Sequence, residues 1–243
     1  MSKKKKLQNY LKLVAEVCSL AEYFTKKISS QLQTSHHMLD LQERLLIGLA
    51  LKMYHAFESL VEDAKRESAE AIHHLKTLVE SFIYLYWAGE KRGDNKKARI
   101  VLAKAYNEKV KFFKSNPDYP DQKSYLQDWE SVIKELTKGI EDEWKKKLKN
   151  KKILELAKEA KMESYYHRVY RLACESAHVT DLVEYMPLPS AFTITLDRPK
   201  TSISWSHVAL YYGLHIMCDL LHECSEFYRL QLDQKISNIR TRI

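Results

Sequence analysis

The chain has 243 residues, of which only five are glycine and five are proline, and its formal net charge is +8 at pH 7. This length suits one large domain or two small ones, and so little glycine and proline favours helices over strands and loops. No apolar stretch approaches the roughly 18 residues that a membrane-spanning helix needs, and the lysine-rich N-terminus lacks the apolar core of a secretory signal. The sequence therefore predicts a cytoplasmic, helical protein that does not cross a membrane.

The cysteines and the net charge give only general information about the redox state and the partners of the protein. The four cysteines are Cys18, Cys174, Cys218 and Cys224, and no two of them form a C-x-x-C pair. In a chain of this length, scattered cysteines favour reduced thiols over a disulfide framework. The modest positive charge is compatible with an acidic partner such as RNA, and equally with none.

Apolar residues recur at steps of three and four along most of the chain, which is the helical period. They predict seven helices, at about residues 5–31, 39–63, 68–91, 96–115, 122–153, 164–182 and 206–236. Gly93 supplies a C-cap to the third helix, and Asp94 or Asn95 opens the fourth. Pro117 and Pro120 prevent the fourth helix from continuing.

The predicted architecture is all-α, with about seven helices in a single bundle domain that spans the whole chain. Its core comes from residues 5–92 and 153–236, and the charged helical segment at 94–152 can protrude. Prolines and two short alternating runs predict a small β-hairpin or an extended insertion near residues 190–205. In the helix that follows, Tyr211 recurs with the apolar residues and is a predicted core position.

Residues 164–182, SYYHRVYRLACESAHVTDL, hold the polar residues whose spacing best suggests chemistry. In a regular helix of 100° per residue, His167, Arg171, Cys174 and His178 follow one another at steps of four, three and four. These four side chains are therefore expected on one stripe of the helix.

Arg171 and His178 are the two residues of this stripe that suit phosphodiester chemistry. Arginine is a fixed cation that grips phosphate oxygens with a fork of donors, and histidine exchanges a proton near neutral pH. Glu175 lies within reach of both on the helix surface. The alternative is structural, because Arg171 and Glu175 can also form a partly buried ion pair, with His178 as a satisfied histidine at the helix end.

A second charged residue, Glu80, falls among apolar residues of the third predicted helix. A carboxylate in such a place is costly to desolvate unless it has a partner. We expect that partner on another helix, and Arg171 is the first candidate.

Two patterns raise the question of a metal, although the prediction is that none is bound. His215, Cys218 and His222 share a helix at i, i+3 and i+7, but no second cluster completes four zinc ligands. Two Glu-x-x-His pairs have the spacing found in di-iron helical bundles; these are Glu70 with His73, and Glu175 with His178. Such short matches arise easily by chance, so both hypotheses stay open.

Two stretches resemble a widespread bacterial and archaeal helical family of unknown function. Its members carry an "aliphatic, Arg, small, aliphatic, aliphatic, Glu" segment, which is similar to residues 75–80, LKTLVE. They also carry a "Tyr-Arg-x-x-Ser-Glu-x-x-His" segment, which is similar to residues 170–178, YRLACESAH. Lys76 stands where the family usually has Arg, and Cys174 where it usually has Ser.

The spacing of Arg171 and His178 also resembles the Arg-x4-6-His signature of HEPN ribonucleases. In that superfamily the arginine and histidine of two subunits meet in a dimer cleft and cut RNA without metal. The resemblance implies that His178 exchanges protons with the 2′-hydroxyl and the leaving oxygen, that Arg171 stabilises charge on the phosphorane, and that Glu175 orients one of them. Leu172 is apolar where the HEPN pattern usually has a polar residue.

The resemblance implies a HEPN-like, metal-independent ribonuclease or toxin-type effector of an antiphage defence module, acting as a homodimer on RNA without a cofactor. The predicted catalytic residues are Arg171, His178 and Glu175, supported by Glu80, Lys76, Tyr170 and Cys174. The alternative is a non-catalytic scaffold or sensor subunit that contacts a partner protein of the same module. In that case Tyr170, Arg171, Glu175, His178 and Glu80 form a buried polar network that fixes the fold.

Overall fold

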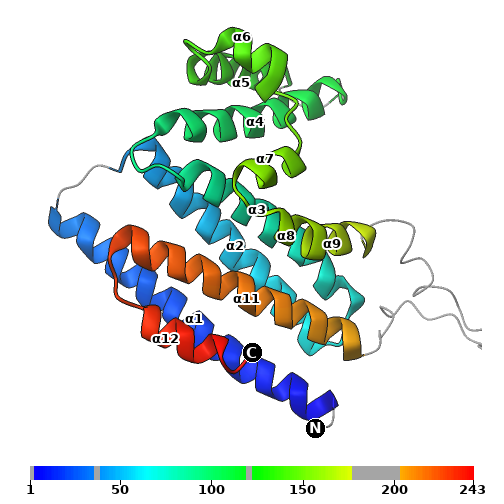
Figure 1. Ribbon diagram of the computed structural model, residues 1–243. Coiled ribbons are helices and arrows are strands. Elements are labelled where there is room, and N and C mark those ends of the chain that lie inside the picture. Colours follow the sequence, from blue (N-terminus) through cyan, green and yellow to red (C-terminus); the bar gives the residue numbers. More distant parts are fainter. Residues whose placement is uncertain (1–2, 36–38, 119–121, 177–202) are drawn as a thin grey trace, which may run out of the picture. The chain divides into compact units, whose positions relative to one another are not determined.

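The computed structural model describes residues 3–35, 39–118, 122–176 and 203–243, and within these ranges it is all-α, as the sequence predicts (Figure 1). In chain order the elements are α1 (Lys3–Ser35), α2 (Leu41–Lys65), the 3-10 helix η1 (Ala69–Ile72), α3 (His73–Gly89), α4 (Asn95–Lys114), α5 (Gln122–Leu136), α6 (Glu141–Glu143), the π-helix η2 (Trp144–Leu148), α7 (Ile153–Glu159), α8 (Glu163–Tyr165), the π-helix η3 (Tyr166–Tyr170), α9 (Arg171–Ser176), α11 (Ile203–Tyr228) and α12 (Asp233–Arg240). No helix in these ranges combines the length and the apolar content needed to cross a bilayer.

The helix count is about ten in the described part of the chain, so the prediction of seven is wrong. Some of the additional helices come from breaks inside predicted ones. The predicted helix at 206–236, for example, is interrupted between α11 and α12, where Arg229 and Gln231 both have φ of 55°. A residue in this left-handed region cannot continue a right-handed helix, so the chain turns there.

The predicted hairpin or insertion near 190–205 is wrong for its last three residues. Residues 203–205 form the first turn of α11, and residues 190–202 lie outside the described ranges. No strand occurs in the part of the chain that the structure describes.

Contacts divide the chain into two compact units. The first comprises residues 1–38, 50–82 and 163–243, and the second comprises 39–49 and 83–162. Helices α2 and α3 each contribute residues to both units. This division does not decide whether the chain is one domain, which stays a prediction.

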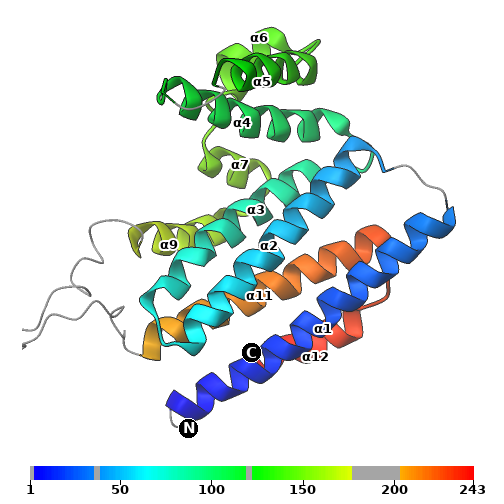
Figure 2. The same cartoon turned by 180° about the vertical axis from the view of Figure 1, so that it is seen from behind.

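In the first unit, α1, α11 and α12 lie side by side (Figures 1 and 2). Gly213 lets α11 approach α2 closely, because a Cβ atom at this position would lie 3.2 Å from Leu60 Cδ1 and 3.2 Å from Phe57 Cε2. Phe57 and Leu60 are fully buried. Burial of a side chain of this size stabilises the fold by about 2–3 kcal/mol.

Helix α12 is held by an apolar face and by charge at its end. Leu232, Ile236 and Ile239 are buried at steps of four and three. Beyond the helix, both terminal nitrogens of Arg242 donate to the Glu16 carboxylate of α1, at 2.8 and 2.7 Å. The short C-terminal helix α12 is therefore packed as part of the first unit.

In the second unit, the fully buried amide of Gln42 joins the start of α2 to the turn after α3. Its Nε2 donates to the carbonyl oxygens of Ala88, at 2.6 Å, and Lys91, at 2.9 Å. Its Oε1 accepts from the N–H of Gly93 at 2.7 Å. The predicted N-cap of α4 is confirmed, because the Asp94 side chain accepts from the N–H of Lys96. The prediction that Gly93 is the C-cap of the third helix is wrong, because α3 ends at Gly89 and Gly93, with φ of +80°, lies in the turn that follows.

Candidate functional site

The segment that holds the predicted site is not a regular α-helix. Residues Tyr166–Tyr170 form the π-helix η3, in which the N–H of Arg171 bonds to the carbonyl of Tyr166, five residues back. A π turn holds more residues than an α turn, so the expected stripe of 100° per residue is wrong across this segment. Both His167 and Arg171 are exposed, while Val169 faces the core.

The structure brings several of the predicted supporting residues together behind Arg171. Burial raises the pKa of the Tyr170 hydroxyl, and the charge of Glu80 and a hydrogen bond with Cys174 raise it further. Glu80 therefore lies near Tyr170, which stays a neutral hydroxyl at physiological pH. Lys76, one turn before Glu80 on α3, is half-buried.

Two of the predicted catalytic residues cannot be placed. His178 lies outside the described residues, and Glu175 falls in α9 with a side chain that is also outside the described part. Arg171 is the predicted catalytic residue whose exposure the structure establishes.

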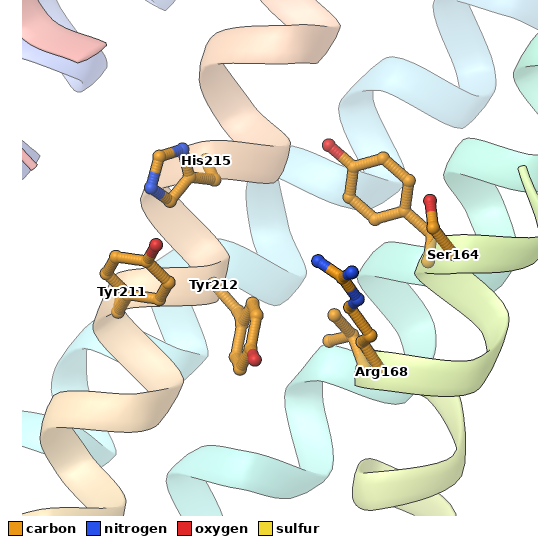
Figure 3. A pocket seen from close by; sticks show the side chains of 7 residues that line it. Ser164, Arg168, Tyr211, Tyr212 and His215 are labelled. Atoms are coloured by element: carbon orange, nitrogen blue, oxygen red, sulfur yellow. The ribbon is translucent and has the colours of Figure 1, made fainter. Parts of the chain in front are cut away.

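A pocket of about 250 Å³ lies next to this segment, between η3 and α11 (Figure 3). It is lined by Ser164, Tyr165, Arg168, Val169, Tyr211, Tyr212 and His215. Ser164 and Arg168 form one wall, and Tyr211, Tyr212 and His215 form the facing wall. We refer to this cavity as the Arg168 pocket.

The wall of the Arg168 pocket is fixed by a hydrogen-bonded carboxylate. Asp219, one turn beyond His215 on α11, accepts from the Tyr165 hydroxyl and from the guanidinium of Arg240. Burial raises the pKa of Asp219, and the charge of Arg240 opposes that effect. Burial lowers the pKa of His215, and Arg240 lowers it further, so the imidazole that faces the pocket is neutral at pH 7.

Arg168 and Tyr211 give the pocket its polar and aromatic character. The Arg168 side chain is exposed and makes no hydrogen bond or ion pair with another residue of the described ranges. Tyr211 is 39% exposed, so its prediction as a core residue is wrong. Its ring meets those of His215 and Tyr212 at steep angles, with centroids 4.6 and 5.2 Å away.

The zinc set suggested by sequence does not come together. Cys218 is fully buried, and burial raises the pKa of its thiol to about 11, so the thiolate that zinc prefers is disfavoured. His222 instead gathers with Glu223 and Glu226, with ligand atoms within 4.8 Å of one another, and its Nδ1 lies 2.9 Å from Asp233 Oδ1. Surface acidic groups often gather in this way without an ion, and the function proposed below does not use this group.

In the first Glu-x-x-His pair, the side chains of Glu70 on η1 and His73 on α3 contact each other. Oε2 of Glu70 lies 2.9 Å from Nδ1 of His73. Neither residue belongs to a group of three possible metal ligands within the described ranges. The second pair, Glu175 and His178, falls where side chains are not described.

Fold and site together define an all-α protein with an arginine-bearing, tyrosine-lined pocket and a second exposed arginine three residues further along the chain. The chain belongs to DUF5677, a family of unknown function whose model matches residues 43–186. The match includes Glu80, Arg168 and Arg171, and it ends before the tyrosines of α11. No curated protein and no solved structure matches the chain.

Sequence reasoning missed the Arg168 pocket. Arg168 lies three residues before Arg171, and this spacing of two cations on a helix was the available signal. Tyr211 and Tyr212 carried no such signal, because aromatic residues at helical spacing are usual in a core.

Proposed function

We propose that the protein is a HEPN-like, metal-independent ribonuclease that acts as a toxin-type effector, with Arg171 and His178 as its catalytic pair. The observation that carries the proposal is the exposure of Arg171, which lies three residues after the exposed, pocket-lining Arg168. A phosphate from solvent can reach an exposed guanidinium, whereas a buried arginine would serve the fold alone.

The reaction needs two proton transfers and one group that stabilises negative charge. The 2′-hydroxyl oxygen attacks phosphorus and forms the O2′–P bond, while one His178 takes the hydroxyl proton. The P–O5′ bond then breaks, and the leaving oxygen receives a proton from a second imidazole, which a homodimer supplies as His178 of the partner subunit. Arg171 stabilises the charge of the phosphorane between these steps, and the products are a 2′,3′-cyclic phosphate and a 5′-hydroxyl.

The residues behind Arg171 act as positioning residues in this proposal. The half-buried Tyr170 lies near Glu80 and Cys174, and Tyr170 is the residue directly before Arg171. A packed hydroxyl fixes the end of η3 and thereby the point from which the arginine side chain leaves the helix. Glu175 orients Arg171 or His178.

The test is cleavage of a labelled single-stranded RNA by the purified protein in excess EDTA. The wild type and the matched control His167→Ala, which removes an exposed histidine of the same segment, should both cleave. His178→Ala should abolish cleavage and leave the thermal midpoint nearly unchanged. Absence of cleavage by the wild type, or full activity of His178→Ala, would refute the proposal.

One observation favours the alternative of a non-catalytic scaffold or sensor subunit. The Tyr170 hydroxyl, Glu80 and Cys174 form a half-buried polar group of the kind that fixes a fold. A scaffold predicts no cleavage in any buffer and a markedly lower melting temperature for Glu80→Ala, because a broken buried network costs several kcal/mol.

A further inference from the structure

The Arg168 pocket carries a positive charge that the described residues do not neutralise. An arginine in this state offers all its guanidinium donors to a ligand, and phosphate oxygens match their geometry. Asp219, the carboxylate that fixes the pocket wall, is already held by Arg240 and by the Tyr165 hydroxyl. Its charge is therefore largely compensated and does not repel an anion from the pocket.

The facing wall offers an aromatic surface. Tyr211 keeps 39% of its surface accessible, although His215 and Tyr212 hold its ring from the side. A ring that is held in place and still accessible loses little entropy when a base stacks on it. The neutral imidazole of His215 and the Ser164 hydroxyl each offer a hydrogen-bond donor and acceptor to the edge of a base or to a 2′-hydroxyl.

The size of the cavity limits what it can hold. At about 250 Å³ it is smaller than the roughly 300–1,000 Å³ of pockets that enclose whole drug-sized ligands. It has room for a single base, with the sugar and phosphate at its rim. Bases of a duplex are stacked and paired, so only an unpaired nucleotide can enter.

We propose that the Arg168 pocket binds one unpaired nucleotide of single-stranded RNA, with the phosphate on Arg168 and the base against Tyr211. This inference rests on the ribonuclease function proposed above, since it names a part of the RNA substrate and the residues that hold it. The pocket selects single strands and positions the chain, and it takes no part in proton transfer.

The test is binding of a fluorescein-labelled 2′-O-methyl RNA decamer, measured by fluorescence anisotropy. This probe lacks the attacking 2′-hydroxyl, so binding is measured without cleavage. Arg168→Gln and Tyr211→Ala should each weaken binding about tenfold, as the loss of one phosphate contact or one stacked base does. Tyr211→Phe, which keeps the ring, and Arg44→Gln, which removes an exposed arginine of the second unit, should bind like the wild type.

The outcomes separate this inference from the proposed function. The pocket assignment fails if the wild type does not bind the decamer, or if Arg168→Gln and Tyr211→Ala bind it as tightly as the wild type. If both variants lose binding while the wild type leaves unmodified RNA intact, the pocket assignment holds and the ribonuclease proposal fails. If the wild type cleaves unmodified RNA and both variants bind the decamer as tightly as the wild type, the ribonuclease proposal holds and the pocket assignment fails.

Discussion

Replacement of Gln42 by alanine should destabilise the second unit more than most single substitutions. The side chain is fully buried and makes three hydrogen bonds of 2.6, 2.9 and 2.7 Å to the backbone of residues 88, 91 and 93. Each such bond contributes about 1 kcal/mol net, so the loss is about 3 kcal/mol. For a chain of this size that corresponds to a decrease of about 6–12 °C in the melting temperature.

The assay is thermal unfolding followed by circular dichroism, with urea unfolding as a second measure of the free energy of unfolding. Gln127→Ala is the matched control, because Gln127 is exposed on α5 in the same unit and its loss should change stability by less than about 0.5 kcal/mol. Gln42→Glu should be at least as damaging as Gln42→Ala, since a carboxylate would face two carbonyl oxygens. A melting temperature for Gln42→Ala within about 1 °C of the wild type would refute the reasoning, because unpaired buried backbone groups would then cost nothing.

Three further predictions concern His215, Asp219 and two glycines. The pKa of His215 is lowered in the folded protein, so its contribution to stability is complete above the unfolded pKa of about 6.5. This contribution is lost as the pH falls through the lower folded pKa. In urea titrations between about pH 7 and 5, the wild type should therefore lose more unfolding free energy than His215→Gln. Asp219→Ala removes the acceptor of Tyr165 and Arg240 and should cost about 2 kcal/mol, whereas Asp128→Ala, at an exposed position of α5, should be neutral in the same titration. Gly48→Ala adds a Cβ that meets nothing within 4 Å and should stabilise α2 by up to about 1 kcal/mol, while Gly213→Ala should fall short of that gain in thermal melts because its Cβ meets Leu60 and Phe57 at 3.2 Å.

Much of the fold could be predicted from the sequence because helical periodicity is a local signal. The apolar spacing placed the long helices near α1, α2 and α4, and Gly93 with Asp94 marked the turn after α3 because both act on the backbone next to them. The break between α11 and α12 was missed, since Arg229 and Gln231 adopt positive φ without being glycine or asparagine. Positive φ is uncommon at residues of these types, so the local sequence did not indicate the turn.

The site was harder to predict because it depends on which side chains of neighbouring helices face one another, and the spacing of residues along the sequence does not show this. The sequence pointed to the right segment, but a regular helix through 164–182 ignores the extra residue in the turn of η3. Tyr211 has the spacing of a core residue, but it lines the Arg168 pocket and is 39% exposed. Which helices face one another decides this, and that information is tertiary.

The extent of the family match bears on how chemistry and recognition could be divided in this protein. Arg168 and Arg171 lie inside the matched residues 43–186, whereas Tyr211 and His215 lie on α11, beyond them. Under the two proposals, cleavage depends on residues of the family region and the stacking surface depends on a helix outside it. Substitutions on α11 should therefore change which single strands bind without changing the proton transfers, so that Tyr211→Ala raises the RNA concentration needed for cleavage and leaves the rate at saturation near that of the wild type. A fall in the saturated rate with unchanged binding would instead place Tyr211 in the chemical step and refute this division.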